Sequence, residues 1–138
     1  MAEPPLAAGA PAPPGPEPLC RSQDLVERGR AWVWSVLQYG QPVRAFALRF
    51  DGRVHAYLNR CAHVPTEMDW QPGEFLDSDR RWILCSIHGA TYDPASGRCV
   101  GGPCGRGRLT PIATEERDGA VLWQPTRDIR PAAAGSAA

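Results

Sequence analysis

Lysine is absent from this 138-residue chain; arginine supplies all 15 basic side chains, and 15 acidic residues balance them to zero net charge. A nucleic-acid-binding protein is expected to carry a basic excess, so the composition argues against that kind of partner. The chain has no apolar run approaching the ~20 residues that a membrane-spanning helix needs. It also begins without a basic segment followed by an apolar one, which excludes a recognisable secretory signal. The predicted location is the cytoplasm, with neither nucleic acid nor membrane as a partner.

Both ends of the chain have little that can form a core. From Met1 to about Pro18 almost every residue is Ala, Pro, Gly or Glu, and the last eight are mostly Ala, Gly and Ser. Such segments bury too little apolar surface to offset the entropy cost of ordering them. We therefore predict a disordered leader over residues 1–21, one domain over residues 22–125 and a flexible tail over residues 126–138. The ~100 residues of the domain suffice for one modest core.

Short apolar segments separated by turn residues predict strands. Residues 43–50 and 53–58 flank Asp51-Gly52, a dipeptide typical of a two-residue hairpin turn. A second hairpin is expected around Asp118-Gly119. Residues 31–37 are rich in aromatic and β-branched side chains, which also favour a strand.

Helices are predicted to play little part. Prolines interrupt the chain too often for long helices. The one short helix that the pattern predicts runs from Ser22, as N-cap, to Gly29, as the stop. The sequence therefore indicates an all-β fold, a small sandwich or barrel.

Cysteine and histidine fall into two paired motifs. Cys61-Ala62-His63 follows the strand that ends near Leu58, and Cys85-Ser86-Ile87-His88 follows a predicted strand over residues 81–84. Each motif places one thiol and one imidazole in a loop at a strand end, where backbone can fold around a metal. Two thiolates and two imidazoles suit either zinc or an iron–sulfur centre.

The order of the ligands separates these alternatives. Zinc fingers and ribbons usually pair Cys with Cys and His with His at short spacing, whereas each loop here supplies one of each. That order suits a two-iron cluster with two Cys on one iron and two His on the other. A zinc-bearing interaction module without a redox role is the rival interpretation.

The residues around both motifs resemble the Rieske family. The stretch from Cys85 to Asp93 is similar to the family's second cluster loop, and Cys61-Ala62-His63 to its first. Gly102-Pro103 resembles the proline loop that closes over the cluster, and the similarity extends over about residues 31–123. The resemblance implies a Rieske-type antiparallel β sandwich or barrel, with a cluster-binding subdomain formed by two loops. It also implies one [2Fe–2S] cluster per chain.

The resemblance assigns the ligands. Cys61 and Cys85 would bind the inner iron by sulfur, and His63 and His88 the outer iron by Nδ1. The far nitrogens of the two imidazoles would then lie near solvent. No catalytic residue is implied.

Three departures from the family pattern matter. Residues 64–84, between the motifs, are more numerous than in most members, with the extra length expected near residues 73–80. Thr66 and Ile87 stand where respiratory and photosynthetic members carry cysteines that bridge the loops. Ala90 replaces a serine that donates a hydrogen bond to the cluster, whereas the hydroxyl of Tyr92 is expected to reach the sulfur of Cys61.

The function implied is one-electron transfer by a carrier that is not itself an enzyme. A Rieske oxygenase also needs a mononuclear iron on two His and a carboxylate, and after His63 and His88 only His55 is left. The chain would be a ferredoxin that exchanges electrons with a flavin reductase, an oxygenase or both. The alternative is a small electron-transfer subunit of a larger redox enzyme, as in assimilatory nitrite reductase.

Two further cysteines bracket the proline loop. Cys99 and Cys104 would either form a disulfide that stiffens this loop or stay as two reduced thiols. No role is assigned to Cys20, and His55 is interpreted as a surface residue. Thiols are usually reduced in the cytoplasm, but the closeness of Cys99 and Cys104 in the sequence keeps the disulfide open as well.

Arginines lie close in sequence to the cluster loops. Arg60, Arg106 and Arg108 would form either a basic collar for an acidic redox partner or ordinary solvated surface charges.

Overall fold

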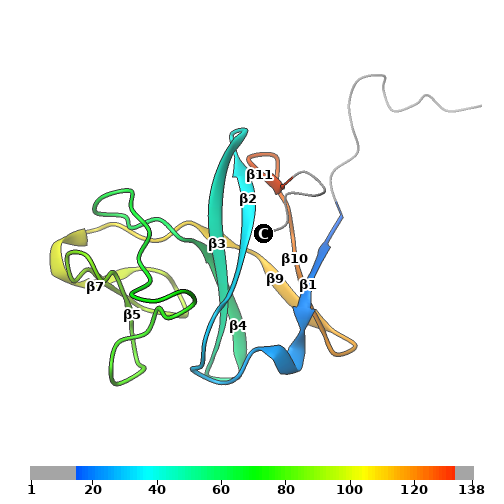
Figure 1. Ribbon diagram of the computed structural model, residues 1–138, viewed down its shortest axis with the longest axis horizontal. Coiled ribbons are helices and arrows are strands. Elements are labelled where there is room, and N and C mark those ends of the chain that lie inside the picture. Colours follow the sequence, from blue (N-terminus) through cyan, green and yellow to red (C-terminus); the bar gives the residue numbers. More distant parts are fainter. Residues whose placement is uncertain (1–14, 133–138) are drawn as a thin grey trace, which may run out of the picture.

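The computed structural model describes residues 15–132, which form three antiparallel sheets (Figure 1). The strands are β1 (Glu17–Arg21), β2 (Trp32–Gln38), β3 (Gln41–Phe50), β4 (Arg53–Leu58), β5 (Ile83–Leu84), β6 (Thr91–Tyr92), β7 (Cys99–Gly101), β8 (Pro111–Ile112), β9 (Thr114–Arg117), β10 (Ala120–Trp123) and β11 (Ile129–Pro131). Two short 3-10 helices, η1 (Ser22–Asp24) and η2 (Gly102–Cys104), interrupt them. The predicted all-β class is confirmed. Within the described range, no helix is both long enough and apolar enough to span a bilayer.

The sheets divide the molecule into a base and a smaller subdomain. The base contains a five-stranded sheet of order β11-β2-β3-β4-β8 and a three-stranded sheet of order β1-β10-β9. The subdomain contains the short strands β5, β6 and β7 and lies at one end of the molecule (Figure 1, left). Both Cys–His motifs border this subdomain.

Tight hairpins connect the long strands of the base. Asp51-Gly52 joins β3 to β4 with φ of +53° and +79°, and Asp118-Gly119 joins β9 to β10 with +54° and +79°. Positive φ at both central residues is the pattern of the two-residue hairpin turn, so both predicted hairpins are confirmed. A third turn, Tyr39-Gly40 (+51° and +78°), joins β2 to β3. It was not predicted, because tyrosine is not a turn-forming residue.

Strand β3 is covered on both faces, which gives the molecule two clusters of buried side chains instead of the single core predicted. Because side chains alternate along a strand, Val43, Ala45 and Ala47 face the cluster between the two base sheets, and Phe46 and Leu48 face the subdomain. The strand is therefore the wall shared by base and subdomain.

The buried side chains between β3 and the subdomain fix the subdomain to the base. The rings of Phe46 and Phe75 stack with centroids 3.7 Å apart. The Tyr57 hydroxyl, in β4, donates to the Pro94 carbonyl just after β6 (2.7 Å). Burial raises the pKa of Tyr57 to about 12, so this donor stays protonated. The cluster loops are thus carried on a rigid support.

The two predicted domain boundaries are wrong at both ends. Glu17–Arg21, assigned to the leader, is strand β1 and pairs with β10, and Ile129–Pro131, assigned to the tail, is β11 and pairs with β2. Pairing along open sheet edges, packing of the partly buried Leu19 and burial of Ile129 offset the ordering cost that composition alone suggested. The rest of the predicted leader and tail, residues 1–14 and 133–138, lies outside the described residues.

The predicted helix over Ser22–Gly29 is a single 3-10 turn. The Arg49 side chain donates to the carbonyls of Ser22 (3.0 Å) and Leu25 (2.8 Å). These oxygens therefore bond to a guanidinium, and the helix does not continue past Asp24.

In the long segment between the motifs, residues 73–80 contact the connection between β1 and β2. The Ala31 N–H donates to the Gly73 carbonyl (2.8 Å), and Arg80 Nη1 donates to the Arg28 carbonyl (2.9 Å). The extra length that the sequence places there is thus held against the base.

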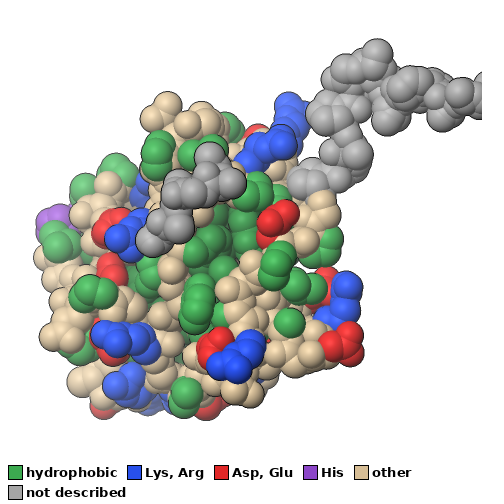
Figure 2. Space-filling view, turned by 45° about the vertical axis from the view of Figure 1, so that its right-hand side comes forward, with side chains coloured by type: hydrophobic (Ala, Val, Ile, Leu, Met, Phe, Trp, Pro, Cys, Tyr) green, Lys and Arg blue, Asp and Glu red, His purple; other side chains and the backbone are tan. Residues whose placement is uncertain are grey.

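Basic and acidic side chains are interspersed on the face that Figure 2 shows. Arg49 pairs with Glu116 (2.8 Å) and Arg28 with Asp51 (2.9 Å). This distribution agrees with the zero net charge of the chain.

Candidate metal centre

The first Cys–His motif lies in a loop that leaves β4 and is closed by Asn59. The Asn59 side chain accepts from the Met68 N–H (2.8 Å) and donates to the Asp69 carboxylate (3.0 Å). Asn59 is only 4% exposed, and its hydrogen bond with Met68 is buried, whereas the one with Asp69 is partly buried. Inside the loop, the Cys61 N–H donates to the Thr66 carbonyl (2.9 Å). The loop is therefore closed at its base and again within it.

The second motif is the tip of the hairpin formed by β5 and β6. The Cys85 N–H donates to the Ala90 carbonyl (2.8 Å), and the Gly89 N–H donates to the Cys85 carbonyl (2.9 Å). The Ser86 N–H donates to the Met68 carbonyl (3.0 Å) at the end of the first loop. Backbone hydrogen bonds thus bring the two motifs together from distant parts of the sequence.

Both thiols of the motifs are inside the molecule, since Cys61 is 3% and Cys85 0% exposed. Tyr92 Oη lies 3.2 Å from Cys61 Sγ and accepts a hydrogen bond from the Ala62 N–H (3.0 Å). Burial, and then the contact with Cys61, raise the pKa of Tyr92, so its hydroxyl keeps the proton that it donates to a thiolate. The contact predicted between Tyr92 and Cys61 is confirmed.

Backbone N–H groups also face the two sulfurs. In each loop, the N–H groups two and three residues after the cysteine donate to its sulfur. Burial acts to raise the pKa of the Cys61 thiol, but Tyr92 and these N–H groups outweigh it and lower the pKa. At Cys85 burial prevails and raises the pKa. Donors of this kind stabilise negative charge on sulfur, as a metal-bound thiolate requires.

The two imidazoles lie at the surface beside these buried sulfurs. His63 and His88 are exposed, with ring centroids 5.1 Å apart and planes nearly perpendicular at 87°. The fold therefore brings all four predicted ligands to one end of the subdomain, with the thiols inside and the imidazoles outside.

This donor set fits a two-iron cluster. In such a centre, two Cys serve one iron and two His the other, and the site offers one pair of each. Among residues 15–132, no three His, Cys, Asp or Glu side chains converge as a single metal ion would require.

A third loop, the predicted proline loop, lies against the other two. At Gly102 φ is +80°, and a Cβ there would lie 2.6 Å from the Gly89 carbonyl oxygen, so only glycine allows this approach. Cys99 and Cys104 form a disulfide across the loop, with Cα atoms 5.8 Å apart. Of the two alternatives for these cysteines, the structure shows the disulfide.

The cysteine and histidine that were assigned no role lie away from the two motifs. Cys20 packs against the cluster between the base sheets, where burial, and then Asp24, raise its pKa to about 11. His55 is half-buried in β4, not fully on the surface, and burial lowers its pKa.

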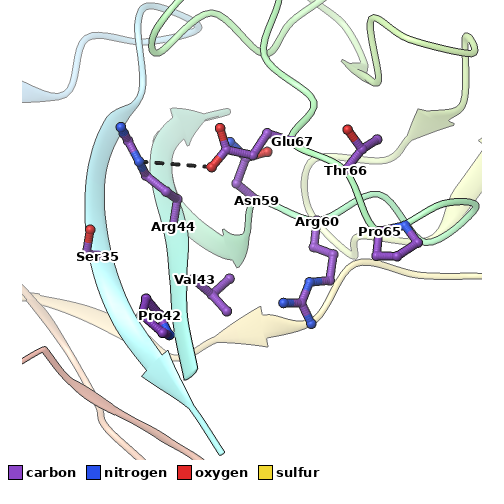
Figure 3. A pocket seen from close by; sticks show the side chains of 9 residues that line it. All are labelled: Ser35, Pro42, Val43, Arg44, Asn59, Arg60, Pro65, Thr66 and Glu67. Carbon is purple, nitrogen blue, oxygen red and sulfur yellow. Dashed lines mark ion pairs between the residues drawn. The ribbon is translucent and has the colours of Figure 1, made fainter. Parts of the chain in front are cut away.

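The three arginines predicted as a collar do not line one surface. Arg60 lines a pocket of about 290 Å³ between β2, β3 and the first loop, across which Arg44 Nε and Glu67 Oε2 are 4.0 Å apart (Figure 3). Arg106 and Arg108 line a different groove.

Asn59 and Asp69, which hold the first loop, were missed by the sequence reasoning. Asp69 binds both the Asn59 amide and the Gly73 N–H (3.1 Å). An asparagine directly after an apolar strand is a signal that identifies Asn59. Nothing near Asp69 in the sequence indicates its role, because its partner is ten residues away.

An all-β domain with one cysteine and one histidine in each of two adjoining loops defines a class, that of proteins with a mixed-ligand two-iron centre. The chain belongs to the Rieske [2Fe-2S] domain family, whose model matches residues 16–114. The predicted family and its [2Fe–2S] cofactor are thereby confirmed. The assignment of the individual ligands stays a prediction. The sequence matches no curated protein.

Solved structures share the fold. The ferredoxin of carbazole 1,9a-dioxygenase from Nocardioides aromaticivorans IC177 is 16% identical with a TM-score of 0.62, covering 82% of this chain and 100% of that one. A 2-oxoquinoline 8-monooxygenase component is 23% identical with a TM-score of 0.60, covering 83% of this chain and 26% of that one. A fluorene-bound oxygenase and ferredoxin complex of carbazole 1,9a-dioxygenase is 20% identical with a TM-score of 0.64, covering 80% and 30%. This chain thus spans less than a third of the latter two.

Proposed function

We propose that this chain is a Rieske-type ferredoxin, which holds one [2Fe–2S] cluster on Cys61, His63, Cys85 and His88 and carries single electrons. The observation that carries the proposal is the division of the four side chains by burial. Both thiols are buried and accept hydrogen bonds from backbone N–H groups, whereas both imidazoles are exposed.

The division assigns a task to each pair. Cys61 and Cys85 would hold one iron by sulfur, and their burial would keep water from the sulfurs. His63 and His88 would hold the other iron, and their exposed imidazoles would face a partner. When bound, such a cluster supplies a one-electron couple between roughly −150 and +300 mV. The N–H groups and Tyr92 stabilise the negative charge on sulfur.

The partner proposed is an oxygenase, with a flavin reductase as electron source. Support comes from the ferredoxin of carbazole 1,9a-dioxygenase, which this chain matches over that protein's whole length. A catalytic role would require a second iron on two His and a carboxylate, and His55 is the one histidine left over. The chain therefore acts as a carrier within an oxidoreductase system, and its cytoplasmic location stays a prediction from the sequence.

Metal content and visible absorption test the proposal. Purified protein should be brown, with two iron atoms and two acid-labile sulfides per chain, and should give a two-iron electron paramagnetic resonance signal after reduction. Colourless protein with stoichiometric zinc would instead establish the interaction module. Iron without acid-labile sulfide would also contradict the proposal.

A further inference from the structure

A groove of about 600 Å³ lies beside the proline loop and plays no part in holding the cluster. Its walls are the turn from Asp93 to Val100 and the segment Gly105–Arg108. We call it the arginine groove, because Arg98, Arg106 and Arg108 line it. Arg98 was not singled out in the sequence.

Among residues 15–132, no ion pair neutralises the arginines of this groove. In the described part of the chain, the arginines that pair with carboxylates are Arg21, Arg28, Arg30, Arg44, Arg49 and Arg117. All three groove arginines are exposed, and the Arg108 side chain donates to the Ser96 carbonyl (3.3 Å).

Asp93, the one carboxylate among the described residues that line the groove, is occupied by its own turn. Asp93 accepts from the Ala95 N–H (3.2 Å) and from the Ser96 hydroxyl (2.9 Å). Three guanidinium groups against one engaged carboxylate leave the groove strongly positive in a chain of zero net charge. A surface of this kind attracts carboxylates.

The backbone that carries these arginines is held in place. Arg98 and Arg108 form an antiparallel bridge, and the Cys99 N–H donates to the Gly107 carbonyl (3.0 Å). The disulfide from Cys99 to Cys104 fixes the same wall. Pre-ordered backbone reduces the entropy cost of binding a partner.

The groove also adjoins the candidate cluster site. A Cβ at Gly107 would lie 2.8 Å from Ala62 Cβ, within the first motif, and Gly102 contacts the second loop at Gly89. A protein segment in the groove would therefore lie against the loops that carry the ligands.

From this arrangement, and on the basis of the proposed ferredoxin function, we infer that the arginine groove docks a carboxylate-rich segment of the redox partner protein. Arg98, Arg106 and Arg108 form ion pairs with its Asp and Glu side chains. Val100, which is 50% exposed, supplies an apolar contact at the rim. Because the groove is beside the cluster loops and not on the imidazoles, docking there leaves His63 and His88 free to face the partner's own redox centre.

Binding of a fluorescein-labelled octaglutamate peptide tests this inference. The cluster-loaded protein is titrated at low ionic strength, and fluorescence anisotropy gives the dissociation constant. Changing Arg98, Arg106 and Arg108 together to Gln should raise that constant by about tenfold, since each exposed ion pair contributes modestly. Added salt should weaken binding to the unchanged protein.

Matched variants control for net charge and for folding. Changing Arg53, Arg127 and Arg130 to Gln removes the same charge from exposed positions outside the groove, and should change the constant by less than about twofold. Changing the three groove arginines to Lys keeps the charge and should retain most of the binding.

The outcomes separate the inference from the proposed function. Cluster-loaded protein that does not bind the peptide, or that loses binding equally in both Gln variants, overturns the docking inference and leaves the ferredoxin intact. Inorganic tripolyphosphate is the competing probe. If it binds more tightly than octaglutamate, and if the Gln variant of the groove arginines loses that binding, the groove binds phosphate and the docking inference is overturned. Protein that assembles no cluster overturns the proposed function, and the inference with it.

Discussion

At the scale of single residues, the site depends on which side chains water can reach. Cys61 and Cys85 are enclosed, whereas His63 and His88 are exposed. A thiolate in an apolar interior requires compensating donors, and each loop supplies them from its own backbone.

Removal of one imidazole should remove the cluster. We expect His63→Ala and His88→Ala each to abolish the two-iron electron paramagnetic resonance signal, because one iron would lose one of its two protein ligands. His55→Ala, which alters a histidine outside both motifs, should leave the signal and the iron content unchanged. Survival of the native signal in His88→Ala would show that the ligand assignment is wrong.

Tyr92 should tune the reduction potential without holding the cluster. Because Tyr92 Oη already accepts from the Ala62 N–H, its proton is directed at Cys61 Sγ. That donor stabilises the reduced state, which is the more negative one, and Tyr92→Phe removes it. For a one-electron couple, a tenfold change in the equilibrium constant corresponds to about 59 mV. Loss of a hydrogen bond of about 1 kcal/mol should therefore lower the potential by about 40 mV. Protein-film voltammetry measures this shift, and an unchanged potential would mean that the hydroxyl does not act on the cluster.

At the scale of elements, three loops depend on one another. Asn59 closes the first, the Ser86 N–H ties the second to the end of the first, and the third approaches both through glycines. Displacement of any one loop therefore disturbs the others, although they are far apart in the sequence.

Gly102 should be the most sensitive glycine of these loops. Gly102→Ala places an alanine at a φ of +80°, which is unfavourable for it, and its methyl would lie 2.6 Å from the Gly89 carbonyl oxygen. The proline loop must therefore move. Gly119→Ala is the matched control, because φ is +79° there and no atom lies within 4 Å. The control should lose about 1 kcal/mol of unfolding free energy and keep its cluster. Gly102→Ala should lose more and release iron faster to a chelator; equal effects of the two substitutions would argue against the close approach.

At the scale of the whole molecule, segments from both ends of the described chain complete the base. β1 covers the edge of β10, and β11 covers the edge of β2. The family match begins at residue 16, within one residue of β1. The base in turn supports the subdomain through β3, Phe46 and Tyr57.

Truncation should distinguish β1 from the residues before it. Protein that lacks residues 1–21 loses the β1–β10 pairing and the burial of Leu19 and Cys20. We expect its free energy of unfolding in urea to fall by about 2 kcal/mol. Protein that lacks only residues 1–14 should differ from the full chain by less than about 0.5 kcal/mol. Equal stability of the two truncated proteins would restore the domain boundary predicted from composition.

The sequence by itself determined the features that depend on near neighbours. Asp51-Gly52 and Asp118-Gly119 specify their hairpins because the turn conformation is decided within two residues. The Cys-x-His and Cys-x-x-His spacings indicate the metal chemistry because each loop carries its own pair of ligands. The all-β class followed for the same reason, from local alternation and frequent prolines.

The tertiary structure alone decided what depends on distant partners. Whether Glu17–Arg21 is disordered or a strand depends on the open edge of β10, a hundred residues away in the chain, and no local composition reports it. The 3-10 turn at Ser22 binds Arg49 from a distant strand, and Arg98 joins Arg108 because two segments pair. The division of the ligands into buried thiols and exposed imidazoles likewise appears only when both loops pack against β3, because burial is a property of the assembled fold.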